Sequence, residues 1–181
     1  MAEAAGCAWP LVGGAQLRLL ERDDAVELQA LIVANREYLA AWLPWAAVQT
    51  GADTLAFIAR TSRQLRDNDG FQAAVSVDGA IAGVVGYHSV DWKHRRTSIG
   101  YWLAADRQGQ GTMTAAVAAL TRHALEVWGL GRVEIRAAAE NLRSRAIPER
   151  LGFAEEATLH RAERVGDRSL DLVVYSVLAS I

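Results

Sequence analysis

The chain has 181 residues, of which 51% are hydrophobic, and this suits one domain with a substantial buried core. Its formal net charge of −2 excludes nucleic-acid binding driven by an overall positive charge, so we expect no direct nucleic-acid partner. The only cysteine, Cys7, excludes an internal disulfide framework and a cysteine zinc site.

The start of the chain predicts no targeting segment. Residues 1–14 lack the basic start and the apolar core of a signal peptide. Later apolar runs fall short of the roughly 20 residues that span a bilayer. We therefore expect an N-terminal tail over residues 1–14, a single domain over residues 15–181, and a cytoplasmic protein with no membrane partner.

The first third of the chain predicts one strand and two helices. Residues 16–20 alternate polar and apolar side chains, as a half-buried strand does. The acidic residues 21–24 then favour the start of a helix, which Pro44 should end or bend. A second helix is expected over residues 54–66.

Residues 71–104 predict an antiparallel meander. The pair Asp78-Gly79 lies between two apolar runs and suits a tight two-residue turn. A charged loop follows, and residues 97–104 form the third strand. The rest of the chain predicts a long helix over residues 112–128 and a strand over 132–139. A short helix over 141–150 and a second hairpin over 157–178 follow. The result is a mixed α/β (α+β) fold with about seven strands and about four helices.

Gly109 and Gly111 stand where the third strand of the meander gives way to the long helix. Two glycines can simply form a tight turn, but they also let an anion approach the free N–H groups at a helix start. Thr114 occupies the place of the third glycine of a dinucleotide loop, and no Gly-Lys-Ser/Thr follows as in a P-loop. Both of those phosphate loops are therefore excluded.

This turn resembles the (Gln/Arg)-x-x-Gly-x-(Gly/Ala) pyrophosphate loop of the GNAT superfamily of acetyl-CoA-dependent N-acyltransferases. The resembling residues are Gln108, Gly109, Gln110, Gly111, Thr112 and Met113. Met113 departs from the small residue usual at the end of the loop. Three further stretches carry a resemblance to one branch of the superfamily: LAAWLPW, IGYWL and residues 141–153. Through them and the loop, the chain is similar to the ribosomal-protein N-terminal (serine/alanine) acetyltransferases and their small-molecule-modifying relatives.

The resemblance implies a single GNAT-like domain whose mostly antiparallel mixed sheet splays between its fourth and fifth strands. The pantetheine arm of acetyl-CoA would pair with the exposed backbone of the fourth strand. N–H groups at Tyr101, Trp102 and Leu103 would then hold the thioester carbonyl. Ordinary packing is the alternative for the Tyr101 and Trp102 side chains.

Asn141 and Ser144 lie one helical turn apart and can face the same slot. The resemblance implies that Ser144 bonds or protonates the leaving sulfur and that Asn141 bonds the pantetheine, with Arg143 and Arg145 as candidates for CoA phosphates. Pro148 cannot donate to the carbonyl of Ser144, which loosens the helix there. The alternative is that Asn141 only caps the helix and the arginines are solvated.

A base for the acceptor amine is less evident, because Ser98 stands where many relatives carry glutamate. His88 has a suitable unperturbed pKa and is the leading candidate, ahead of Asp91 and Glu37, with a purely structural role for a lone strand histidine as the alternative. An α-amine, with a pKa of about 8, is partly neutral at pH 7, whereas a lysine starts roughly 3 kcal/mol worse. We therefore expect an acceptor of modest pKa, with His88 or water taking the proton.

Trp42 and Trp45 are the candidate acceptor-binding residues, with a packed helix corner as the alternative. The cluster Lys93-His94-Arg95-Arg96 can attract an acidic acceptor or be merely solvated. The expected co-substrate is acetyl-CoA or another short acyl-CoA such as succinyl-CoA, without a metal. The acceptor is a protein N-terminus or a small amine such as an antibiotic or polyamine, and the enzyme a monomer or homodimer. A catalytically silent acyl-CoA-binding module is the alternative from a different class.

Overall fold

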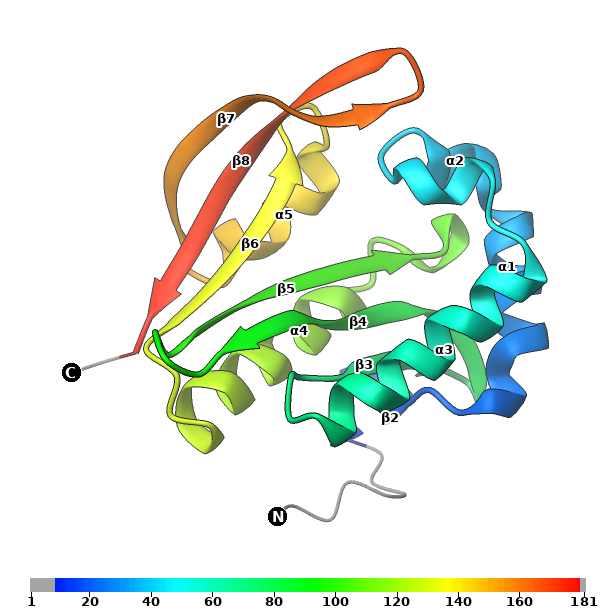
Figure 1. Cartoon of the computed structure of the whole chain (residues 1–181), viewed down its shortest axis with the longest axis horizontal. Coiled ribbons are helices and arrows are strands. Elements are labelled where there is room, and N and C mark those ends of the chain that lie inside the picture. The colour runs from blue at the N-terminus through cyan, green and yellow to red at the C-terminus, as the bar shows by residue number, and fades with distance from the viewer. Residues whose placement is uncertain (1–8, 180–181) are drawn as a thin grey trace.

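One mixed sheet forms the centre of the computed structural model, which describes residues 9–179 (Figure 1). Its strands lie in the order β1-β2-β3-β4-β5-β6-β8-β7. Their bounds are Trp9–Pro10, Gln16–Leu19, Gln72–Val77, Ala80–Asp91, Arg96–Leu103, Arg132–Ala138, Ala154–Val165 and Arg168–Leu178, for β1 to β8. The seven expected strands are confirmed, and β1 is additional. Cys7 lies outside the described residues.

The helices are α1 Ala25–Ala34, α2 Arg36–Ala40, α3 Gly51–Arg66, α4 Thr112–Arg122 and α5 Leu142–Arg150. The expected first helix is divided at Asn35, whose φ of −110° and ψ of 12° are not helical. Its amide donates to the carbonyl of Leu31 (3.0 Å), and its Oδ1 accepts from the backbone N–H of Ala105 (2.9 Å). The break thereby fastens the helical segment to the end of β5.

The Asp78-Gly79 turn has the expected geometry. Both residues have positive φ, 53° and 82°, as a tight hairpin turn with the twist of its flanking strands requires. The turn joins β3 and β4 in antiparallel pairing.

The expected splay lies between β5 and β6. The two strands pair in parallel only over four positions, from Arg96↔Arg132 to Ile99↔Ile135. Beyond this point they diverge into a V, and β6 continues with β8 and β7 as a separate arm (Figure 1). In the part of the chain that the structure describes, the second half of β5 therefore has a strand partner on one side only.

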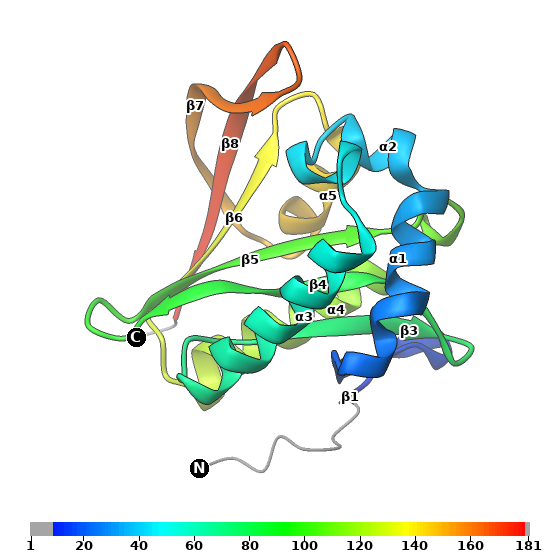
Figure 2. The same ribbon diagram turned by 45° about the vertical axis from the view of Figure 1, so that its right-hand side comes forward.

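Alternation along the strands sorts side chains between the two faces of the sheet. Val85, Ile99 and Ile135 pack in the main core with residues of α4 and α5, whereas Val84 packs with α1 and α3. Figure 2 shows α1 and α3 on one side of the sheet and α4 on the other. The splay consequently opens to both faces.

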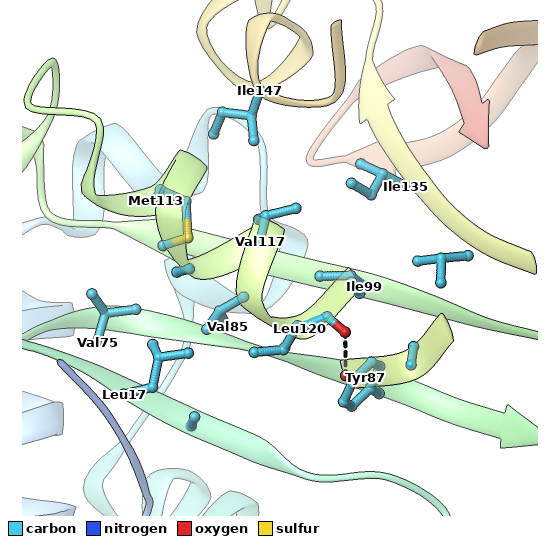
Figure 3. Packing of buried hydrophobic residues seen from close by; sticks show 14 of the residues in the cluster. Leu17, Val75, Val85, Tyr87, Ile99, Met113, Val117, Leu120, Ile135 and Ile147 are labelled. Atoms are coloured by element: carbon cyan, nitrogen blue, oxygen red, sulfur yellow. Dashed lines mark hydrogen bonds between the residues drawn. The ribbon is translucent and has the colours of Figure 1, made fainter. Parts of the chain in front are cut away.

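The main core joins α4 and α5 to the sheet. Figure 3 shows Met113 and Val117 of α4 beside Ile147 of α5, with Tyr87 below. The buried Tyr87 hydroxyl donates a hydrogen bond to the carbonyl of Leu120 (2.7 Å), so this polar group has a partner inside the core. No helix within residues 9–179 is long and apolar enough to cross a membrane.

Candidate active site

A groove with a volume of about 1740 Å³ passes through the splay and is lined from both faces of the sheet. The leading candidate site residues line it, with the exception of Arg145. These are Trp42, Trp45, His88, Tyr101, Trp102, Leu103, Gln108, Gly109, Gln110, Gly111, Thr112, Met113, Asn141 and Ser144. The structure thus brings together residues that are far apart in the sequence.

The glycine loop leaves open space at the start of α4. Gly109 and Gly111 both have a φ of 78°, and a Cβ at either position would meet no protein atom within 4 Å. Gly111 is the N-cap of α4 and supplies no side-chain cap, so the first N–H groups of the helix remain available. This combination fits a phosphate group: the positive φ favours glycine and the helix start favours an anion.

The Gln108 side chain holds this loop to both sides of the groove. Its amide donates to the Tyr38 hydroxyl of α2 (2.5 Å) and to the carbonyl of Leu103 (3.3 Å). Its oxygen accepts from Arg143 of α5 (3.1 Å). Gln108 and Arg143 are therefore positioned by one another at the groove.

The free edge of β5 presents only alternate residues to the gap. Ala104 N–H donates to the carbonyl of Ala82 in β4 (2.8 Å), and backbone groups two residues apart in a strand point the same way. The N–H of Trp102 therefore also faces β4, while those of Tyr101 and Leu103 face the splay. An oxyanion contact from the backbone of Trp102 is not supported by this geometry.

A hydrogen-bonded unit connects Tyr101 of β5 to Ser144 of α5. The Tyr101 hydroxyl donates to the carbonyl of Ser144 (2.9 Å), and the Ser144 hydroxyl lies 3.3 Å from the Tyr101 oxygen, as donor. In a regular helix, the N–H four residues later would bond that carbonyl, but Pro148 has none. Burial raises the pKa of Tyr101 to about 12, so the phenol keeps its proton for this bond.

Asn141 acts as the N-cap of α5. Its Oδ1 accepts a hydrogen bond from the N–H of Ser144 (3.2 Å), which is the capping role that the sequence offered as the alternative for Asn141. Both residues also line the groove. The cap occupies only the oxygen of the amide, and it orients Ser144 at the start of the helix.

The structure does not support Arg145 as a contact for CoA phosphates. Its guanidinium donates to the hydroxyl of Tyr175 (2.8 Å) and the carbonyl of Ala139 (3.1 Å), and it pairs with Glu155 (3.3 Å). These partners lie on the strand arm rather than on the groove. Arg145 is about 100° around the helix from Ser144, so the two side chains face different neighbours.

His88 lies at the rim of the splay, on the α3 side. Its Nδ1 is 3.2 Å from Ser98 Oγ, and its Nε2 lies over Gly100, where any side chain would collide with the ring. Partial enclosure by the protein lowers the pKa of His88, and the charge of Arg136 lowers it further. The imidazole is therefore neutral and able to accept a proton near pH 7. Of the weaker base candidates, Asp91 bonds His94 and Arg96, and neither Asp91 nor Glu37 lines the groove.

Trp42 and Trp45 line the α3 side of the groove and are also packed. Trp42 packs against the cluster of Ala138, Val165 and Leu170, and Trp45 lies beside Trp102, with ring centroids 6.3 Å apart. Arg36 donates to the carbonyls of residues 46, 47 and 49, which fixes the segment that carries Trp45. The two tryptophans are therefore packed against other residues, as the alternative expected, and also form part of the groove wall.

Sequence reasoning missed two arginines and the Tyr101 hydroxyl. Arg60 of α3 and Arg136 of β6 also line the groove, whereas none of the residues Lys93–Arg96 does, and the charge of Arg136 acts on His88. Alternation along β6 predicts that Arg136 projects from the face of the sheet opposite to Val133 and Ile135. Its place at the start of the splay could not be predicted, because it depends on the register between β5 and β6. Within residues 9–179, no three His, Cys, Asp or Glu side chains gather as a metal site would require.

A parallel strand pair that splays beside an open, glycine-rich helix start is the architecture of the N-acyltransferases that the loop resembles. A family model described as "Acetyltransferase (GNAT) domain" matches residues 15–154. The chain belongs to this family of acetyltransferases.

Three similar proteins support this assignment. The chain is 40% identical over 164 residues to the "Putative ribosomal N-acetyltransferase YdaF" of Bacillus subtilis (strain 168), covering 90% of each chain. It is 26% identical over 162 residues to the ribosomal-protein-serine acetyltransferase of Escherichia coli (strain K12), covering 89% of this chain and 90% of the relative. The structure of the microcin C7 self-immunity acetyltransferase MccE with acetyl-CoA and AMP is 28% identical, has a TM-score of 0.86, and is matched over 92% of this chain and 93% of that one.

Proposed function

We propose that the protein transfers an acetyl group from acetyl-CoA to the α-amine of a protein N-terminus, by direct attack within a ternary complex. The observation that carries this proposal is the groove through the splay, which has open space beside the glycines at the start of α4 and is also lined from the α3 side. Acetyl-CoA is present in the similar MccE structure, and two of the similar proteins are named as ribosomal acetyltransferases.

The co-substrate would be held from the α4 side. The N–H groups that follow Gly111 would bind its pyrophosphate, while Arg143 supplies a cation at the same loop. Acetyl-CoA supplies the activated acetyl group. The N–H groups of Tyr101 and Leu103 face the gap and would stabilise negative charge that develops on the thioester oxygen.

Two side chains would assist the reaction, one by a hydrogen bond to the leaving sulfur and one by accepting the amine proton. Ser144 is positioned by Asn141 and Tyr101, and its hydroxyl would turn from the Tyr101 oxygen to donate its one hydrogen bond to the leaving sulfur. A thiol has a pKa of about 8.5, so a hydrogen bond rather than full proton transfer suffices. His88 would accept the amine proton on the α3 side, directly or through water, with Ser98 orienting its ring.

The acceptor follows from the partner of His88, which is the hydroxyl of Ser98 and not a carboxylate at that position. A neutral imidazole can assist an amine that is already partly unprotonated, and an α-amine with a pKa of about 8 meets that condition far better than a lysine at about 10.4. The names of the two ribosomal relatives also favour a protein acceptor. A small-molecule amine is the second candidate, favoured by the AMP in the similar MccE structure.

Thiol release from acetyl-CoA tests the proposal. The purified protein is incubated with acetyl-CoA and, separately, with N-terminal peptides, polyamines and amino sugars, and free CoA is titrated with a thiol reagent. Release that depends on peptides with a free α-amine supports the proposal. Tight acetyl-CoA binding, measured by calorimetry, without turnover on any acceptor would instead indicate a silent acyl-CoA-binding module.

A further inference from the structure

Positive charge dominates the groove. Among residues 9–179, its charged lining consists of five arginines and a single glutamate, namely Arg60, Arg107, Arg136, Arg143, Arg150 and Glu163. Arg107 and Arg143 lie beside the glycine loop, on the side assigned to CoA. Arg60 and Arg136 lie elsewhere and need another explanation.

Alternation places Arg136 on the α3 face. Val133 and Ile135 belong to the core that α4 covers, so the side chain between Ile135 and Ala137 projects to the opposite face. Arg60 approaches the same face from α3. Both side chains are exposed. The two cations therefore line the approach that the acceptor would use, separated by the sheet from the CoA phosphates.

Arg136 also stands at the point where the strands separate. Ile99↔Ile135 is the last pair between β5 and β6, so Gly100 and Arg136 are the first residues on either side of the opening. The ring of His88 lies over Gly100. A base candidate and a cation thus face each other across the opening through which an amine would reach the thioester.

Both guanidinium groups keep unused N–H donors. Arg136 makes one long ion pair, from Nη2 to Glu134 Oε2 (3.3 Å), while the other oxygen of Glu134 is held by Arg132, which also pairs with Glu156. Arg60 makes no ion pair within residues 9–179, whereas Arg132, Arg145 and Arg168 do. Guanidinium groups with unused donors at a groove suit a carboxylate, which they can bind through two parallel hydrogen bonds.

We propose that Arg136 and Arg60 form an anion subsite that selects protein N-termini with an aspartate or glutamate among their first residues. This proposal rests on the proposed acetyl transfer and specifies its acceptor. The acidic side chain of the acceptor would lie against the arginines while its α-amine enters the opening beside His88.

The same charges would help to prepare the amine. Cations close to an amine disfavour its protonated form, so the arginines shift the acceptor toward the neutral state that attacks. The bound carboxylate positions the acceptor, and its own charge is offset by the guanidinium groups. The subsite would thereby compensate in part for Ser98 standing where relatives carry a glutamate.

The test compares three amidated peptides that differ only at their second and third residues, beginning Ser-Glu-Glu, Ser-Gln-Gln and Ser-Lys-Lys. Initial rates are measured at saturating acetyl-CoA for the native protein and for Arg136→Gln, Arg60→Gln and the double variant. Arg63→Gln is the matched control, because Arg63 is exposed on α3 but does not line the groove. Binding of the peptides to the protein–CoA complex is measured in parallel by calorimetry.

We expect kcat/KM and affinity to be about tenfold higher for the Glu-Glu peptide than for the Gln-Gln peptide, and lowest for Lys-Lys. Arg136→Gln and the double variant should lose the preference without a change in the KM for acetyl-CoA, while Arg63→Gln keeps it. Equal affinity for all three peptides, or a preference that persists in the double variant, would overturn the subsite. Selective binding of the acidic peptide without its acetylation would support the subsite and contradict the proposed transfer.

Discussion

At the scale of single residues, His88 is the side chain whose role is most open to measurement. Its environment lowers its pKa, so it stays neutral at pH values where a free histidine begins to gain a proton. For the acetyl transfer proposed here, both His88 and the acceptor amine must be unprotonated. Protonation of either group therefore reduces the rate.

The pH dependence of kcat/KM follows from this pair. Between the pKa of His88 and that of the α-amine, about 8, log(kcat/KM) should rise with a slope of about one. Below the lowered pKa of His88, which lies under about 6.5, the slope should approach two. In His88→Gln the slope should stay near one throughout, with a lower plateau. An unchanged profile would exclude His88 as the base.

Tyr101 is the second informative residue, because its hydroxyl completes a hydrogen bond that Pro148 cannot make. In Tyr101→Phe, the carbonyl of Ser144 loses its donor at a partly buried position, which should lower the free energy of unfolding by about 1–3 kcal/mol. The Ser144 hydroxyl also loses its partner, so we expect kcat to fall while the KM for acetyl-CoA changes little. Urea unfolding and steady-state rates measure the two effects. A fall in stability with unchanged kcat would show a purely structural role.

At the scale of elements, α5 connects the site to the fold through one missing N–H group. In Pro148→Ala, the new N–H can bond the carbonyl of Ser144 and compete with Tyr101. We expect this variant to keep or gain helix stability and yet to lose activity, because the Tyr101 hydroxyl is released from its fixed position.

A double-mutant cycle checks this account of α5. The stability lost in Tyr101→Phe should be smaller in the Pro148→Ala background, where the Ser144 carbonyl already has a donor. Additive changes in the free energy of unfolding would mean that the two residues do not share this carbonyl. Asn141, which caps the same helix, stays unaltered in all four proteins.

At the scale of the whole molecule, the sequence was informative where local chemistry decides the structure. The Asp78-Gly79 hairpin, the strand periodicity and the helix that follows Gly111 depend on neighbouring residues, and all three are confirmed. The splay between β5 and β6 was expected only through the family resemblance, since no local pattern encodes the end of a strand pairing. The fold class was therefore predictable, although the exact strand count was not.

The remaining features depend on contacts between distant segments. Trp9–Pro10 is too short for a strand pattern and is held by pairing with β2 and by stacking of Trp9 on Phe71. The side chain of Asn35 breaks the first helix through a bond to Ala105, which is distant in sequence. Arg145 carries the charge expected of a phosphate ligand, but Tyr175 of β8 lies on its side of the helix. Which polar group a side chain bonds depends on neighbours that are distant in sequence, so it could not be predicted from the sequence.

The central claim is that an α-amine receives an acetyl group from acetyl-CoA in this groove. The direct measurement uses a peptide with a free N-terminal serine and an internal lysine, incubated with the protein and acetyl-CoA, with the product mapped by fragment-ion mass spectrometry. We expect a single acetyl group on the α-amine, and no product when the N-terminus is blocked beforehand. Acetylation of the lysine side chain, or acetyl-CoA binding without any acetylated peptide, would contradict the account.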